Sequence, residues 1–146
     1  MCLHETRHHG KVRGMSTTGV AADPKQMWRD LLARHADVSC ALERELGEKH
    51  DLGLSEFEVL DRMAESHPDC RDPGGKFRVQ ELAEQVHLSQ SALSRLIARL
   101  ERMGLVERAM CDFDRRGVFV VLTGEGRRRH AEASPTHQAV LAQKLG

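Results

Sequence analysis

Residues 79–104 constrain the fold most, because they contain two helical patterns joined by a short connection. Residues 79–86 have the apolar spacing of a short amphipathic helix. Ser89 is a favourable N-cap for a longer helix over residues 90–103, and Gly104 suits a left-handed C-cap. A short helix, a tight turn and a longer helix together predict a helix-turn-helix.

The pattern after Gly104 changes from helical to strand-like. Residues 105–108 and 118–122 are rich in β-branched side chains, and a polar loop over residues 111–117 separates them. These features predict a β-hairpin directly after the helix over residues 90–103. A hairpin in this position is called a wing. We therefore expect a mainly α (α+β) fold, a winged helix-turn-helix with a two-stranded wing and flanking helices.

Helical segments flank this region on both sides. Asp23-Pro24 predicts the start of a first helix that ends near residue 50. Ser55-x-x-Glu58 has the form of a capping box for a second helix over residues 56–66, followed by a loop over residues 67–77. A last helical region begins at Thr123, with an expected interruption at Ser134-Pro135. The predicted organisation is a flexible tail (1–22), an N-terminal helix (23–53), a winged helix-turn-helix (54–123) and a C-terminal helix (124–146).

Charge is distributed unevenly, although the formal net charge of the 146 residues is zero. Residues 23–75 contain 7 Lys and Arg against 13 Asp and Glu, whereas residues 89–130 contain 9 Arg, no Lys and 5 acidic residues. Arg suits bidentate contacts with phosphates and bases, so the basic half favours a nucleic-acid partner.

Several other classes of protein are not indicated. No apolar run approaches the length needed to span a bilayer, and the first residues do not form a secretory signal, so we expect a cytoplasmic location without membrane contact. Met1 and Met15 remain alternative starts. The widely spaced cysteines predict no disulfide framework. No motif of an enzyme, a cofactor site or a metal site is recognisable, and a tail group (Cys2, His4, His8, His9) is interpreted as solvated.

The second helix of a helix-turn-helix normally presents its N-terminal residues to base edges in the major groove. Hydroxyl, amide and guanidinium groups here lie opposite the apolar stripe of the helix, and one further Arg suits a phosphate. A polar wing tip could place Arg in a minor groove. An alternative interpretation of both sets is a solvated surface. The candidate DNA contacts are Ser89, Gln90, Ser91, Ser94, Arg95 and Arg99 on the helix and Asp114, Arg115 and Arg116 on the wing.

These residues resemble the MarR family of bacterial transcriptional regulators over about residues 24–130. The resemblance is carried by residues 79–86, by Ser89-Gln90-Ser91-Ala92-Leu93-Ser94-Arg95-Leu96, by Leu100-Glu101-x-x-Gly104-Leu105-Val106-x-Arg108, by Asp114-Arg115-Arg116-Gly117 and by Leu122-Thr123. It implies a homodimer formed by N- and C-terminal helices that binds a pseudo-palindromic operator on double-stranded DNA, usually as a repressor associated with the nucleoid. Family members usually continue beyond the region equivalent to residues 139–145, so the C-terminal dimerisation helix is expected to be short.

The signal that releases the DNA has three candidates. A small anionic organic effector is suggested by a weak similarity to the urate-responsive branch of the family, carried by Trp28, Asp61, Arg95 and Arg108. Alternatively, Trp28 is part of the core or dimer interface and Asp61 is a solvated charge. Thiol oxidation would use Cys111, which lies near three Arg, while Cys40 is expected to be buried and inert. Metal sensing by the tail is the third candidate.

Two other function classes remain as alternatives. An enzyme would require a nucleophile–base pair or paired carboxylates in a pocket, and no such constellation is recognisable. A winged helix that binds a protein partner is compatible with the same fold. The Arg-only charge asymmetry and the paired Arg at the wing tip favour DNA over a protein partner.

Overall fold

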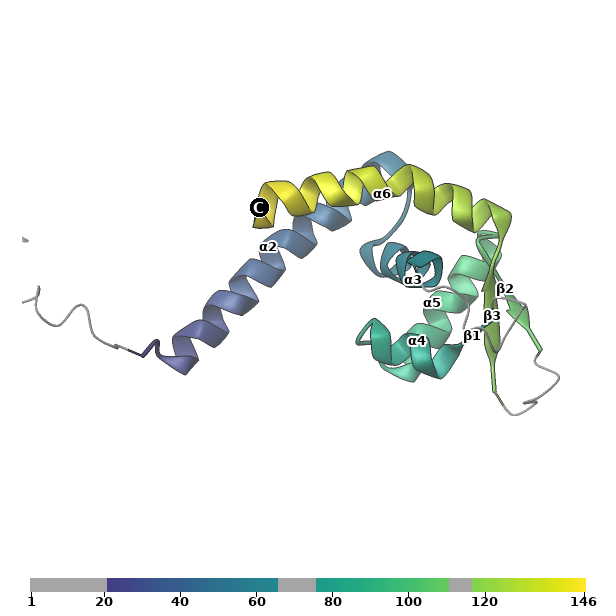
Figure 1. Cartoon of the computed structure of the whole chain (residues 1–146), viewed down its shortest axis with the longest axis horizontal. Coiled ribbons are helices and arrows are strands. Elements are labelled where there is room, and N and C mark those ends of the chain that lie inside the picture. Colours follow the sequence, from purple (N-terminus) through teal and green to yellow (C-terminus); the bar gives the residue numbers. More distant parts are fainter. Residues whose placement is uncertain (1–20, 66–75, 111–116) are drawn as a thin grey trace, which may run out of the picture. The chain divides into compact units, whose positions relative to one another are not determined.

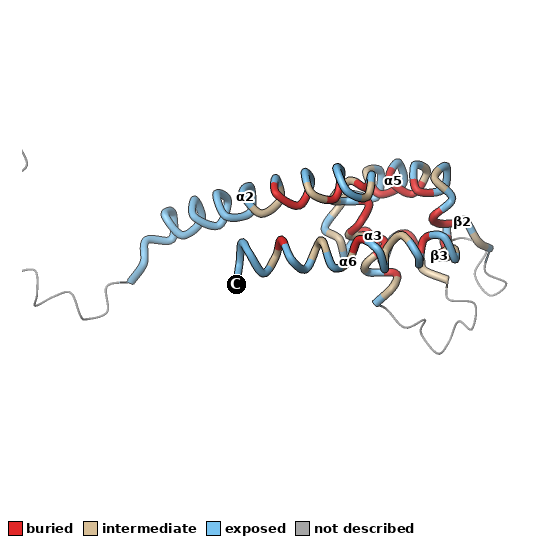
Figure 2. The backbone as a smooth tube through the Cα atoms, turned by 90° about the horizontal axis from the view of Figure 1, so that it is seen from above, coloured by how far each residue is buried: buried red, intermediate tan, exposed pale blue. Residues whose placement is uncertain are grey.

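The structure, a computed structural model, describes residues 21–65, 76–110 and 117–146. The chain divides into two compact units, residues 1–36 and 37–146, and helix α2 (Pro24–His50) contributes to both (Figure 1). In the first unit, every described residue of α2 is exposed (Figure 2). The predicted first helix is thus confirmed, including its start at Pro24.

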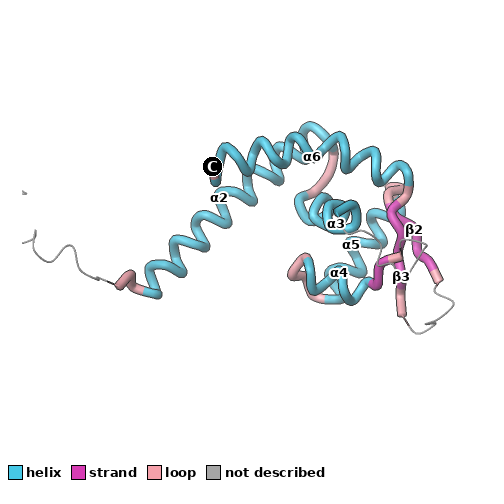
Figure 3. Tube along the Cα trace, in the orientation of Figure 1, coloured by secondary structure: helices cyan, strands magenta, loops and turns pink. Residues whose placement is uncertain are grey.

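The second unit contains four further helices and three strands among its described residues. In chain order they are α3 (Leu54–Glu65), β1 (Phe77–Arg78), α4 (Val79–Gln85), α5 (Gln90–Arg102), β2 (Val106–Ala109), β3 (Phe119–Leu122) and α6 (Gly124–Leu145) (Figure 3). This order confirms the expected mainly helical winged helix-turn-helix.

The wing is part of a three-stranded antiparallel sheet with the order β1-β3-β2. In the hairpin, Val106 pairs with Leu122 and Ala109 with Phe119. The third strand, β1, pairs Phe77 with Val120 on the other side of β3. The predicted two-stranded wing is confirmed as the β2–β3 hairpin, and the additional strand β1 was not predicted. Strand β1 has two residues, too few to show an alternating pattern, and it lies at the end of a segment expected to be a loop.

The core is aliphatic apart from two phenylalanines, in keeping with an aromatic content of 3%. Its fully buried side chains come from segments far apart in the chain and include Leu46, Phe57, Leu93, Leu105 and Val120. The apolar stripe of α5 is buried, while the opposite face of this helix is exposed (Figure 2). The stripe consists of Leu93, Leu96, Ile97 and Leu100. Burial of this stripe fixes which face of α5 remains available to a partner.

Helix α3 begins two residues earlier than the sequence predicted. Its first residue is Leu54, and the backbone N–H of Gly53 donates a hydrogen bond of 3.2 Å to Glu56 Oε2. Glu56, rather than Glu58, therefore occupies the third helical position and reaches back to the cap. The sequence prediction gave Ser55 priority over Gly53, although Gly also caps helices.

Helix α6 is continuous, and the predicted interruption at Ser134-Pro135 is wrong. Pro135 has no N–H to donate, so the helix loses one backbone hydrogen bond at that point. Packing on both sides of the proline compensates for this loss, because Ala133 and Val140 are buried. The Thr136 hydroxyl also lies 2.8 Å from His50 Nε2 at the end of α2. Such tertiary contacts routinely override local helix propensity.

Two histidines of α6 pair with carboxylates of α3 on either side of Phe57. His130 Nε2 lies 2.7 Å from Asp61 Oδ1, and His137 Nε2 lies 3.4 Å from Glu58 Oε1. The Phe57 ring contacts both imidazoles, with centroid distances of 5.4 Å to His130 and 4.5 Å to His137. Polar pairs and aromatic packing together hold α6 against α3.

We predict that Gly126→Ala destabilises the protein although alanine favours helices. A Cβ at Gly126 would lie 2.1 Å from the carbonyl oxygen of Leu105, which is backbone and already accepts the N–H of Thr123. Gly124→Ala is the matched control, since a Cβ there meets nothing within 4 Å. Overpacking should cost Gly126→Ala about 1–3 kcal/mol of unfolding free energy in urea denaturation. Equal stability of the two variants would contradict this close packing.

A second prediction concerns pH and Glu58. The hydrogen bond from His137 lowers the pKa of the Glu58 carboxyl below its ordinary value. The unfolded chain then binds more protons, so this contribution to stability is present above the ordinary pKa and is lost as pH falls through the folded pKa. The stability difference between the wild type and Glu58→Gln should therefore shrink with acidification. Urea unfolding across a pH series measures it, with the exposed Glu48→Gln as the control; a difference independent of pH would contradict the pairing.

Candidate nucleic-acid interface

The turn between α4 and α5 is built by local backbone geometry. His87 has a left-handed φ of 58°, and the N–H of Leu88 donates to the carbonyl of Ala83 at 3.0 Å. Ser89 then caps α5, because its Oγ accepts the backbone N–H of Ala92 at 3.1 Å. At the other end, Gly104 has the predicted left-handed φ of 77°. These contacts fix where the recognition helix begins and ends.

The predicted recognition residues share the exposed face of α5. Gln90, Ser91, Ser94 and Arg95 are all exposed, opposite the buried stripe. The structure thus places them where a partner can reach them, and their contacts with DNA stay a prediction. Ser89 has a structural role that its predicted role in recognition did not include, since its hydroxyl is engaged by the cap.

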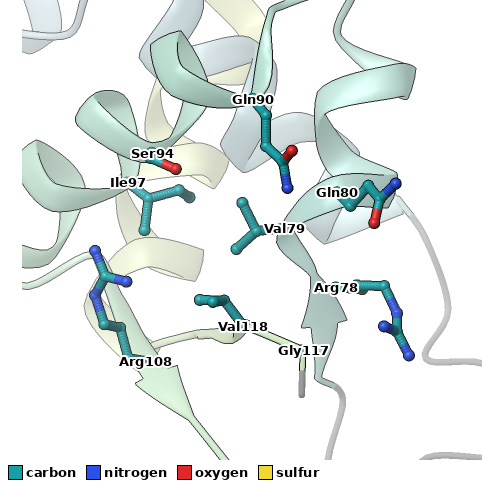
Figure 4. A pocket seen from close by; sticks show the side chains of 9 residues that line it. All are labelled: Arg78, Val79, Gln80, Gln90, Ser94, Ile97, Arg108, Gly117 and Val118. Carbon is teal, nitrogen blue, oxygen red and sulfur yellow. The ribbon is translucent and has the colours of Figure 1, made fainter.

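A hollow of about 200 Å³ lies between the start of α5, the start of α4 and the base of the wing. Gln90 and Arg108 line it from different elements, with Val79 and Val118 between them (Figure 4). Its other polar side chains come from Arg78, Gln80 and Ser94. The recognition helix and the base of the wing therefore present amide and cationic groups around the same hollow.

The sequence prediction missed two cationic residues, Arg78 in strand β1 and Lys76 just before it. The Arg78 guanidinium lies 5.1 Å from the centroid of the Phe119 ring and 3.8 Å from Glu81. Lys76 Nζ donates to the carbonyl of Met110 at 2.8 Å. The alternation of Lys76, Phe77 and Arg78 was the available signal, because alternate residues of an extended segment lie on the same side.

Arg99 has an intramolecular partner that was not predicted. Its Nη2 lies 2.7 Å from Oε1 of Glu56 at the start of α3. Arg95, one turn earlier on α5, has no ion-pair partner among the described residues. Both arginines line a second, shallow hollow of about 320 Å³ together with Ser55. The two arginines of this face thus differ in their availability to a phosphate.

The predicted effector residues are not gathered around one described hollow. Asp61 pairs with His130 between α3 and α6, and Arg108 Nε lies 3.2 Å from Glu101 Oε1. Arg95 and Arg108 line different hollows, and Asp61 lines neither of them. Trp28 belongs to the first unit and is 59% exposed, so it is not a core residue there.

The remaining predicted sites lie outside the described residues or differ from expectation. The wing-tip residues Asp114, Arg115 and Arg116 and the redox candidate Cys111 lie outside them, as does the tail group of Cys2, His4, His8 and His9. Cys40 is a free, exposed thiol, so its expected burial was wrong: it lies on a face of α2 that no described residue covers.

Residues 21–65, 76–110 and 117–146 hold no group of three or more His, Cys, Asp or Glu side chains that could bind a metal ion. No helix within them is long and apolar enough to cross a membrane.

Comparisons with known proteins agree on one family. The model of the MarR family matches residues 50–117. AbsC, a MarR family transcriptional regulator from Streptomyces coelicolor, is 32% identical with a TM-score of 0.73, and the match covers 88% of this chain and 82% of AbsC. Sco3205, a MarR family regulator from the same organism solved in complex with DNA, is 29% identical with a TM-score of 0.74, covering 88% of this chain and 76% of Sco3205.

A third similar structure carries a small molecule. CouR from Rhodococcus jostii RHA1, bound to p-coumaroyl-CoA, is 26% identical with a TM-score of 0.66, and the match covers 79% of this chain and 76% of CouR. No curated protein sequence matches this chain.

We predict that Ser89→Ala lowers the unfolding free energy by about 1 kcal/mol, because an orphan backbone N–H at the start of α5 loses its acceptor. Ser89→Asn should restore most of the stability, since its side-chain oxygen can also cap. Ser91→Ala is the matched control, because the Ser91 hydroxyl accepts no backbone N–H in the described structure. Urea denaturation measures all three variants, and equal losses for Ser89→Ala and Ser91→Ala would refute the cap.

Proposed function

The chain belongs to the MarR family of DNA-binding transcriptional regulators, which are not enzymes, and on that premise we propose that it binds a pseudo-palindromic operator as a homodimer and releases it in response to a small effector. The observation that carries the proposal is the capped recognition helix, whose exposed polar face adjoins the hollow at the base of the wing. Such a helix fits the major groove, and a wing fits the adjacent minor groove.

The base contacts are proposed for the first turns of α5. Gln90 can pair with adenine and Arg95 with guanine, while Ser91 and Ser94 suit bases or phosphates. All four side chains are exposed, and Sco3205 was solved with DNA in a similar fold. For the wing, Asp114, Arg115 and Arg116 are proposed to enter the minor groove on the basis of their sequence alone.

A second copy of the chain is proposed to cover the apolar face of the first unit. Met27, Trp28, Leu31 and Leu32 are 48–60% exposed there. Positions 27 and 31, and 28 and 32, are each one helical turn apart, so the four side chains form one stripe. Contiguous exposed apolar surface of this kind usually marks an interaction site. Two copies would also present two recognition helices to the two halves of a pseudo-palindrome.

The proposed effector is a small anionic organic molecule. CouR was solved with p-coumaroyl-CoA, an anionic ligand, in a similar fold. The candidate residues Trp28, Asp61, Arg95 and Arg108 are proposed for its binding on the basis of the sequence resemblance alone. Arg95 and Arg108 line separate hollows of the DNA-binding region, so an effector at either one would compete with DNA for a cation.

The test is a titration of the protein against the DNA upstream of its own gene, at two salt concentrations and with a random duplex as competitor. We expect a dissociation constant of roughly 10⁻⁸ M or tighter that weakens steeply with salt, because several phosphates are neutralised. Two chains should bind each operator, as judged by the mass of the complex. Binding no tighter than to the random duplex would contradict operator recognition, and one chain per operator would contradict the homodimer.

A further inference from the structure

Glu56 is the one buried polar or charged side chain among the described residues, with 6% of its surface exposed. Burial of a carboxylate is costly unless ion pairs and hydrogen bonds replace its water. A carboxylate that stays charged at a buried site requires ion-pair or hydrogen-bond partners close to it. The positions of these partners show which segments of the chain the carboxylate connects.

Both oxygens of Glu56 are engaged by different parts of the chain. Oε2 accepts the backbone N–H of Gly53 at 3.2 Å, which ties the carboxylate to the start of α3. Oε1 lies 2.7 Å from Nη2 of Arg99, near the C-terminal end of α5. The neighbouring N–H of Leu54 donates to Glu43 Oε2 of α2 at 3.0 Å. Glu56 therefore connects the α2–α3 junction to the recognition helix through a single short contact.

Arg99 and Arg95 occupy equivalent places one helical turn apart, but only Arg99 reaches Glu56. Both line the hollow that Ser55 of α3 borders. Arg95 has no ion-pair partner within the described part of the chain, so none of these residues competes with a phosphate or base for its guanidinium. The same face thus holds one anchored and one available arginine.

We propose that Glu56 and Arg99 are positioning residues that hold the recognition helix in the orientation required for operator binding. This inference rests on the proposed DNA-binding function and assigns Arg99 to an internal contact in place of the predicted phosphate contact. The Glu56 carboxylate is held in place by its burial and by the Gly53 N–H. Its ion pair with Arg99 then fixes the position of α5 relative to the start of α3. Movement of the α2–α3 junction would then change the placement of Gln90, Ser94 and Arg95.

The direction in which Glu56→Gln changes operator affinity distinguishes this positioning role from an effect of charge alone. Glu56→Gln removes a negative charge near the DNA-binding face, which by charge alone should strengthen binding to a polyanion. It also keeps the volume of the side chain and an oxygen for the Gly53 N–H. Loss of the ion pair should nevertheless weaken operator binding, because α5 is no longer held. The positioning role and the charge effect therefore predict opposite results.

The experiment measures operator and random-duplex affinities of the full chain over a range of salt concentrations. The variants are Glu56→Gln, Arg99→Gln and the double variant, each at a temperature where circular dichroism shows it fully folded. The double variant removes both charges, so it leaves no buried carboxylate without a partner if Arg99→Gln alone fails to fold. Glu84→Gln is the matched control, because it removes the same charge from an exposed position on α4.

We expect Glu56→Gln to lose about tenfold in operator affinity, with random-duplex affinity retained and the double variant no worse than the single variants. The salt slope of operator binding should stay as in the wild type, whereas loss of a phosphate contact lowers it by about 0.9. Glu84→Gln should bind at least as tightly as the wild type.

Operator binding by Glu56→Gln that equals or exceeds the wild type would overturn the positioning role. A reduced salt slope in the Arg99→Gln or double variant would also overturn it, since Arg99 would then contact a phosphate. Either result would leave the proposed function intact if the wild type prefers its operator. A wild type without that preference would overturn the proposed function and this inference together.

Discussion

Burial of one face of the recognition helix determines most of what the second unit can do. Leu93, Leu96, Ile97 and Leu100 are at most 7% exposed, and each removes apolar surface from water. At about 1.5–3 kcal/mol for a fully buried side chain of this size, the four together outweigh any single polar contact of the helix. Rotation of α5 about its axis would expose this stripe, so the polar face is confined to the outer side.

The features that the sequence predicted well are those that neighbouring residues determine. The cap at Ser89, the left-handed Gly104 and the apolar stripe of α5 depend on residues within one or two helical turns. The same holds for the hairpin, whose strands are adjacent in sequence and include the β-branched residues Val106, Val120 and Val121. The helix-turn-helix and wing therefore follow from local patterns, and with them the exposed position of Gln90, Ser94 and Arg95.

The features that were missed depend on residues far apart in the chain. Strand β1 forms because Phe77 and Arg78 pair with the edge of β3 that β2 does not occupy. Helix α6 continues through Pro135 because residues on both sides of the proline are buried. The pairing of Arg99 with Glu56 spans 43 positions, and nothing near either residue indicates it. For the same reason, the sequence alone could not show whether the residues proposed for one effector site lie near one another in the fold.

Charge shows most clearly how the fold modifies what composition suggests. The Arg-rich segment predicted a positive surface, but several of its arginines are partly neutralised within the protein. Arg99 pairs with Glu56, Arg108 with Glu101, and Arg128 with both Glu125 and Glu132. Their contribution to attraction of a polyanion is correspondingly reduced.

On α5, the arginines without an ion-pair partner among the described residues are Arg95 and Arg102. They are seven positions apart, which is about two helical turns, so they lie on one side of the helix. Arg95 is one helical turn from Ser91, whereas Arg102 is the last residue of α5. Ion pairing among the described residues thus distinguishes Arg95 and Arg102 from Arg99, a difference that net charge alone does not show.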